Sequence, residues 1–136
     1  MTLDEIDSGL PNGFHDAEAS QLAVDFLRKT MTLDLDLWIG SMSTPLNAGR
    51  ETYRSAILEL RGLAYFAVEP PDPKYPYAKP GAITVDLCDV EDGSSLSAIQ
   101  SGMFTSRFFV SEWNAFIIVS ASEAVLTWTG EPHNRF

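Results

Sequence analysis

The sequence predicts a mainly β protein, a single-domain antiparallel β-sandwich or partly closed barrel of roughly seven to eight strands with at most one short helix. Two alternating runs joined by a short polar turn, within residues 10–39, give the strongest β-hairpin signal in the chain. Further apolar runs follow at regular intervals, which is typical of sandwiches and barrels. A chain of 136 residues has the length of one domain and can bury a core without disulfides or a metal.

Alternation of apolar and polar residues defines the predicted strands. It is clearest at residues 30–39, where apolar side chains share one face and the other face carries Thr32, Asp34, Asp36 and Trp38. Because successive side chains of a strand point to opposite faces, this run predicts one buried and one largely wet face. The expected strands are residues 17–27, 30–39, 53–60, 63–68, 82–88, 104–110, 115–120 and 123–129.

The remaining segments are expected to be tails and connections around the single domain 1–136. Residues 1–9 and 130–136 are expected as loosely ordered tails. Residues 69–81 contain five of the eight prolines and predict a stiff surface loop, because proline lacks the donor that a central strand needs. Residues 94–101 are the candidate for a short helix. The run 63–68 is apolar on both faces and is therefore expected in the middle of the structure.

The charge balance narrows the possible partners. Nine basic residues against 19 acidic ones give a net charge of −10. This balance argues against nucleic acid and against an acidic membrane surface as partners. A basic protein would be attracted, while the simpler interpretation of the charge is solubility.

Cysteine content and the first residues bear on the compartment. Cys88 is the only cysteine, so no intrachain disulfide can form, and we expect it to be a buried small hydrophobe. The acidic first residues lack the basic and apolar regions of a secretory signal, and no apolar run approaches the ~20 residues of a membrane span. We therefore expect the cytoplasm of a prokaryote-like cell.

His15, Asp16 and Glu18 form the first candidate site. A histidine beside two carboxylates can act as a general base or bind a metal. In an extended segment, Asp16 and Glu18 would share a face and His15 would point away. The alternative is structural, with His15 and Asp16 bonded to the backbone where the chain enters the first strand. His133 is the only other histidine.

Asp34, Asp36 and Trp38 form the second candidate, on the outer face of the second predicted strand. Carboxylates two residues apart on a strand are separated by ~7 Å, which is too far to share one ion without other ligands. A solvated face is the plain alternative. An exposed tryptophan between acids would serve as an anchor for a protein partner, because tryptophan is favoured at binding hot spots.

Tyr75 and Tyr77 in the proline-rich loop form the third candidate, as an aromatic tip that contacts a partner. The proline spacing carries no specific recognition signature, so a rigid connector is the alternative. The sequence contains no serine elbow, phosphate loop, dinucleotide fingerprint or zinc motif. These absences weigh against an enzyme, and we expect no cofactor.

A family resemblance covers most of the chain. The residues that carry it are LPNGFHDAE at 10–18, DLWIG at 36–40, YRSAILELRGLAYFAVEPPDPKYPY at 53–77 and SEWNAFIIVSASEAVLTW at 111–128. They resemble the short, largely uncharacterised bacterial proteins grouped as YxiG-like. The HDAE stretch followed by strands is also similar to some immunity proteins of bacterial toxin systems. The resemblance implies a small β protein and hints at toxin neutralisation, and it supplies no catalytic residues.

Three hypotheses follow. The first is an acidic protein-binding module, in its narrower form an immunity-type protein, which binds through Asp34, Asp36, Trp38, Tyr75 and Tyr77. The second is a metal-binding or hydrolytic enzyme centred on His15, Asp16 and Glu18, which predicts bound metal. The third is a self-assembling structural subunit, because exposed strand edges make a homodimer easy to form.

Overall fold

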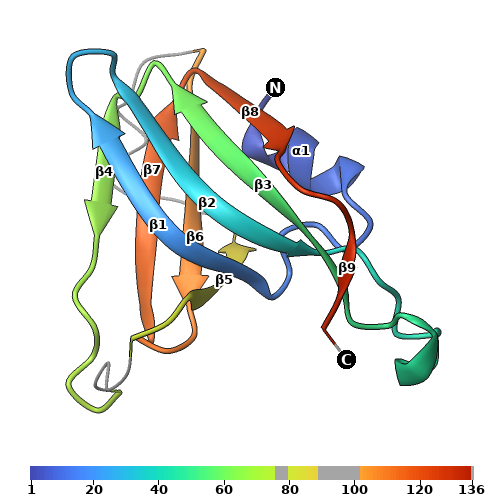
Figure 1. Cartoon of the computed structure of the whole chain (residues 1–136). Coiled ribbons are helices and arrows are strands. Elements are labelled where there is room, and N and C mark those ends of the chain that lie inside the picture. The colour runs from blue at the N-terminus through green and yellow to red at the C-terminus, as the bar shows by residue number, and fades with distance from the viewer. Residues whose placement is uncertain (76–79, 89–101, 136) are drawn as a thin grey trace.

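The computed structural model describes residues 1–75, 80–88 and 102–135. The strands of these residues form one antiparallel sheet (Figure 1). Its strands are β1 (Ala17–Asp25), β2 (Thr30–Trp38), β3 (Thr52–Arg61), β4 (Tyr65–Val68), β5 (Ile83–Cys88), β6 (Phe104–Val110), β7 (Ala115–Ala121), β8 (Glu123–Trp128) and β9 (His133–Asn134). The sheet order is β4-β7-β6-β5-β1-β2-β3-β8, and β9 pairs with β3. In the described residues, helix is confined to α1 (Leu3–Gly9) and a 3-10 turn at Leu46–Ala48. The predicted mainly β class is confirmed.

The hairpin of β1 and β2 forms as the alternation predicts. Their register pairs Asp25 with Thr30 at the tip. The Asp25 carboxylate accepts hydrogen bonds from the backbone N–H groups of Leu27 and Arg28, at 3.0 and 3.1 Å, and Lys29 has a φ of 52°. This turn ends β1 two residues earlier than the alternation predicted, because the Asp25 carboxylate bonds to the turn residues that follow it.

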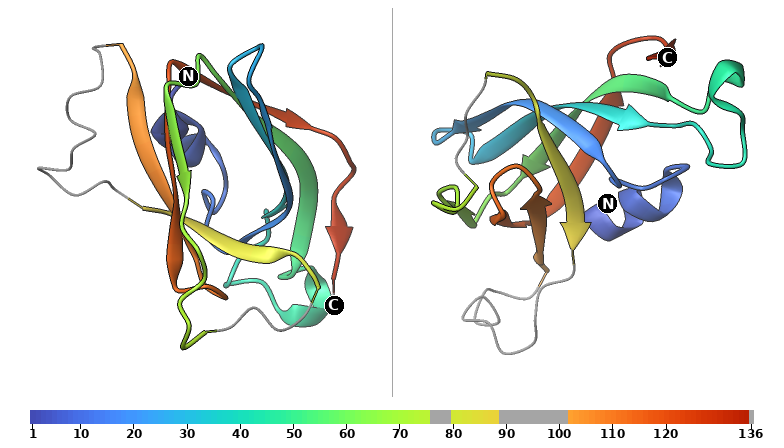
Figure 2. Two further views of the ribbon diagram at one scale, coloured as in Figure 1. Left: turned by 90° about the vertical axis from the view of Figure 1, so that its left-hand side faces the viewer. Right: turned by 90° about the horizontal axis from the view of Figure 1, so that it is seen from below.

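The sheet curls because two of its strands continue through a bend. β3 leads into β4 through Gly62, and β7 leads into β8 through Ser122. Backbone bonds from Ser122 N to Arg61 O (3.0 Å) and from Ala64 N to Ser120 O (2.9 Å) carry the pairing across the bend. The two ends of the sheet therefore belong to one bent ribbon, and the sheet wraps around its core (Figure 2).

Inward side chains from opposite sides of the curled sheet meet in the core. The face of β2 predicted to be inward is fully buried from Met31 to Leu37, and Phe14 packs edge-on against Phe108 of β6 with ring centroids 5.8 Å apart. Further large core side chains are Leu58 and Leu60 of β3, Val85 of β5, Val110 of β6, and Ile117 and Val119 of β7.

Residues 1–9 differ from the loosely ordered tail that we expected. Leu3–Gly9 forms α1, which lies beside β8 (Figure 1). Thr2 and Glu5 make a reciprocal capping box, and Leu3 and Ile6 are buried in the core. The apolar pair three residues apart explains the difference, because it gives one helical turn an inward side despite the surrounding acids.

Residues 130–136 also differ in part from the expected tail, because β9 pairs with β3 although residues 131–135 remain exposed. No helix in the described part of the chain combines the length and apolar character that a membrane span requires. The candidate helix at 94–101 lies outside the described residues.

The position of β4 differs from the expectation for residues 63–68. The run 63–68 was expected in the middle of the structure, but β4 pairs only with β7 among the described strands. Tyr65, Phe66 and Val68 are accordingly exposed. Apolar residues on both faces did not indicate a central strand here, because β4 lies at one end of the hydrogen-bonded order.

Candidate binding face on the outer side of β1, β2 and β3

Glu18, Asp34 and Asp36 lie on the outer side of the β1–β2 hairpin, and we call these three residues the acidic face. Glu18 and Asp36 are direct partners in the antiparallel register, and Asp34 follows two residues from Asp36 on the same face. The three carboxylates line a groove of about 430 Å³. Its other lining residues include Ser20, Ser55, Ile57, Thr129 and Arg135.

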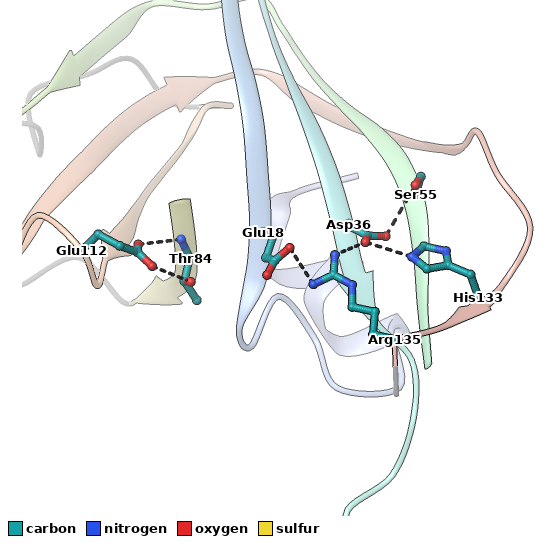
Figure 3. Close-up of polar contacts among 7 residues, drawn as sticks. All are labelled: Glu18, Asp36, Ser55, Thr84, Glu112, His133 and Arg135. Carbon is teal, nitrogen blue, oxygen red and sulfur yellow. Dashed lines mark hydrogen bonds and ion pairs between the residues drawn. The ribbon is translucent and has the colours of Figure 1, made fainter. Parts of the chain in front are cut away.

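The guanidinium of Arg135 is bound at this face. Its Nη1 lies 2.6 Å from Glu18 Oε2, and its Nη2 bonds to Asp36 Oδ2 (Figure 3). The guanidinium carbon also lies 4.0 Å from the centre of the Tyr53 ring. Burial acts to lower the pKa of Arg135, but the bonds to Glu18 and Asp36 outweigh it and raise that pKa above its ordinary value. We call this arrangement of Glu18, Asp36 and Tyr53 the arginine seat.

Two further side chains contact the carboxylate of Asp36. Nε2 of His133 lies 3.1 Å from Asp36 Oδ2, and the Ser55 hydroxyl lies 3.5 Å from Asp36 Oδ1 (Figure 3). The backbone N–H of Arg135 donates to Glu51 O at 2.9 Å. Residues 133–135 are thus attached to the face by polar contacts.

The groove keeps an excess of negative charge. Asp34 makes no hydrogen bond or ion pair through its carboxylate within the described residues, whereas Glu18 and Asp36 share one guanidinium. Glu112, farther along this side, is already engaged, because its carboxylate accepts from the backbone N–H and the hydroxyl of Thr84, both at 2.7 Å (Figure 3). A positively charged group from a partner would therefore find an uncompensated carboxylate at Asp34.

His15 and Asp16 come together with a residue that the sequence did not single out. His15 Nδ1 lies 2.9 Å from Asp86 Oδ1, and His15 Nε2 lies 3.3 Å from Asp16 Oδ2. The Asp16 backbone N–H donates to the same Asp86 oxygen at 3.0 Å. One possible ligand atom from each of the three residues lies within 4.8 Å of the others. A set of one imidazole and two carboxylates can bind a divalent metal.

The predicted trio of His15, Asp16 and Glu18 is therefore divided. Glu18 belongs to the arginine seat, and Asp86 of β5 takes its place beside His15. Asp16 adopts a left-handed backbone with a φ of 53°, so this segment is not extended and His15 does not point away from Asp16. Asp86 could not be found from the sequence, because its position depends on the pairing of β1 with β5.

Trp38 corrects the prediction of an exposed anchor. It is only 9% exposed, and its indole N–H donates to Arg50 O at 2.7 Å. The Asn12 side-chain amide donates to the carbonyls of Trp38 and Gly40, at 3.1 and 2.7 Å. A Cβ on Gly40 would lie 1.8 Å from Arg50 O, which shows how closely the loop after β2 folds back. The alternation breaks at Trp38, because this loop covers its outer side.

The aromatic tip of the proline-rich loop is described only in part. Tyr75 is exposed, and its backbone N–H donates to Asp72 O at 2.8 Å in a turn. Tyr77 lies outside the described residues. Tyr75 is not among the residues that line the groove, so the structure does not join it to the acidic face.

Sequence reasoning missed Tyr53 of the arginine seat and Arg135, which occupies the seat. The charge balance was the available signal for Arg135. In so acidic a chain, the few basic side chains are candidates for ion pairs with carboxylates. The sequence alone could not place Arg135 opposite Glu18 and Asp36, because β9 contains only two residues.

Comparison with known proteins gives a distant similarity to a solved structure. No protein-family model and no functionally curated protein matches the chain. A solved structure described as an uncharacterized protein from Neisseria gonorrhoeae is similar to it, with 13% sequence identity and a TM-score of 0.43. The likeness covers 82% of this chain and 90% of that one.

Proposed function

We propose that this chain is a protein-binding module whose acidic face docks a basic protein partner. The observation that carries the proposal is the bound guanidinium of Arg135, held by Glu18 and Asp36 over Tyr53. The same arrangement suits an arginine from another protein. Arginine is enriched at interface hot spots, where planar, paired recognition of carboxylates gives specificity.

The charge of the whole chain supports the same proposal. A net charge of −10 attracts a basic partner and speeds its encounter, most strongly at low salt. Asp34 adds a carboxylate that is not compensated within the described residues. Long-range attraction and a local seat for arginine thus both favour a basic partner that presents an arginine.

Toxin neutralisation by an immunity-type protein in a bacterial cytoplasm is the narrower form of this proposal. Its support is the resemblance of the HDAE stretch at 15–18 to immunity proteins, together with the acidity of the chain. A basic toxin domain would supply the kind of surface that the acidic face attracts.

Affinity capture from the native cell lysate tests the proposal, with three forms of the protein as bait. We expect the wild type to retain one stoichiometric partner at low salt and lose it at high salt. Glu18→Gln with Asp36→Asn should abolish capture, because both carboxylates of the seat are neutralised. The matched control, Asp4→Asn with Glu123→Gln, removes the same charge from two exposed positions elsewhere. Equal capture by both double variants would contradict the proposal.

A metal site at His15, Asp16 and Asp86 is the second candidate, favoured by the close approach of their ligand atoms. Nitrogen and carboxylate ligands suit Zn²⁺. Added Zn²⁺ should then raise the Tm of the wild type and of His133→Ala but leave His15→Ala unchanged, because only a metal bound by the folded state stabilises it. An identical Tm shift in all three proteins would exclude this site.

A further inference from the structure

We propose that residues 133–135 occupy the arginine seat as an internal stand-in for the partner, and that the partner displaces them by presenting an arginine in an extended segment beside β3. This inference rests on the proposed function and adds the chemistry and conformation of the docking segment. It is carried by the geometry of the seat, by the weak attachment of the segment and by the edge of β3.

The seat selects arginine over lysine. Glu18 and Asp36 lie on adjacent strands as register partners, so a planar fork can bond to both carboxylates at once. Tyr53 offers its ring face to the same group at 4.0 Å. A lysine ammonium is a single point charge without a planar face, and it cannot reproduce this pair of contacts.

The segment that fills the seat is easily released. Residues 131–135 are all exposed, and β9 pairs with β3 at only two positions. Arg135 keeps 30% of its side-chain surface exposed while it is bound. The segment therefore covers little of the core, and its contacts are ion pairs and hydrogen bonds that water or a competing arginine can replace.

The edge of β3 supplies the backbone part of the docking site. β8 pairs with β3 from Ala56 to Arg61, and β9 pairs with Thr52 and Tyr53. The carbonyl of Glu51 accepts from the Arg135 backbone N–H. An extended segment from a partner would make the same backbone bonds if residues 133–135 moved away, which is recognition by strand addition.

Fluorescence anisotropy with a fluorescein-labelled hexa-arginine peptide tests this inference at low salt. We expect Arg135→Gln to bind the peptide roughly threefold to tenfold more tightly than the wild type, because removing an internal competitor raises the fraction of open sites. The matched control is Arg28→Gln, which makes the same charge change at the hairpin tip and should bind like the wild type. Hexa-lysine should bind Arg135→Gln more weakly than hexa-arginine does.

Each other outcome has a distinct meaning. Equal affinities of the wild type, Arg135→Gln and Arg28→Gln would overturn the inference and leave the proposed function standing. Equal tightening in both single variants would also overturn it, since net charge alone would then explain the gain. Equal binding of hexa-lysine would overturn the selection of arginine. Peptide binding by none of the proteins would contradict the proposed function itself.

Amide hydrogen exchange provides a readout of displacement that does not depend on affinity. Saturating hexa-arginine should speed exchange at the Arg135 amide in the wild type, because its bond to Glu51 O is lost. Protection of the Ile117 amide in the core should stay unchanged. Unaltered exchange at Arg135 with peptide bound would mean that the segment is not displaced, and the inference would fail.

Discussion

At the scale of single residues, the partner on the adjacent strand decides which contacts each carboxylate makes. Asp34 and Asp36 occupy equivalent positions on β2, but only Asp36 lies opposite Glu18 and shares its guanidinium. The pairing of strands therefore turns one aspartate into part of a seat and leaves the other open within the described residues.

Tyr53 gives a prediction about pH at this scale. Burial, and after it the nearby Glu51 carboxylate, raise the pKa of Tyr53 above its ordinary 10.0. The folded state then keeps a proton that the unfolded state loses, so its contribution to stability is complete below pH 10 and is lost as the pH rises through the folded-state pKa. The unfolding free energy of the wild type should fall more steeply above pH 10 than that of Tyr53→Phe. Parallel curves for the two proteins would contradict the raised pKa.

At the scale of elements, α1 belongs to the core. Leu3 is fully buried, and Met1 O accepts a hydrogen bond from the backbone N–H of Ala124 in β8 at 2.7 Å. The Asp7 carboxylate also accepts from the Phe14 backbone N–H at 2.8 Å. The helix thus connects β8 with the turn that precedes β1.

Leu3→Ala tests this role of α1. We expect a loss of ~2–5 kcal/mol in the free energy of unfolding, because the substitution leaves a cavity in a packed region. Urea denaturation followed by tryptophan fluorescence measures it. Asp4→Ala, at an exposed neighbouring position, is the control and should change stability by less than ~1 kcal/mol. A loss no greater than that of the control would mean that residues 1–9 are the loose tail first expected.

The bend between β3 and β4 depends on Gly62. Its φ of 62° is disfavoured for other residues, and a Cβ there would lie 2.0 Å from the Ser122 hydroxyl oxygen. Gly62→Ala should therefore cost ~1–3 kcal/mol of stability. Thermal unfolding by circular dichroism measures the loss, with Gly9→Ala as a control because a Cβ at Gly9 meets nothing within 4 Å. Equal Tm values for the two variants would show that the bend tolerates a side chain.

The sequence predicted most strands because alternation is a local property. β2 follows its apolar pattern from Met31 to Leu37, and the predicted strand at 104–110 coincides with β6. The failures have non-local causes: Trp38 is covered by the loop after β2, and β4 lies at an end of the sheet order. Asp86 and Arg135 were missed for the same reason, since Asp86 reaches His15 and Arg135 reaches Glu18 only through strand pairing.

At the scale of the whole molecule, the curled sheet separates a buried interior from an outer side that presents the acidic face. β1 and β2 serve both sides, since Leu33 and Leu35 face the core while Asp34 and Asp36 face the groove. Glu18 and Asp36 are register partners on paired strands, so the geometry of the site does not depend on a loop.

The most direct test of the account is to map hexa-arginine binding by two-dimensional NMR. We predict that the largest amide shift changes at low salt occur at Glu18, Asp34, Asp36 and Tyr53 and in residues 133–135. Binding at the arginine seat would account for that pattern. Shift changes spread evenly over the acidic surface, or centred on distant acids such as Asp4 and Glu123, would contradict the claim that the acidic face is the docking site.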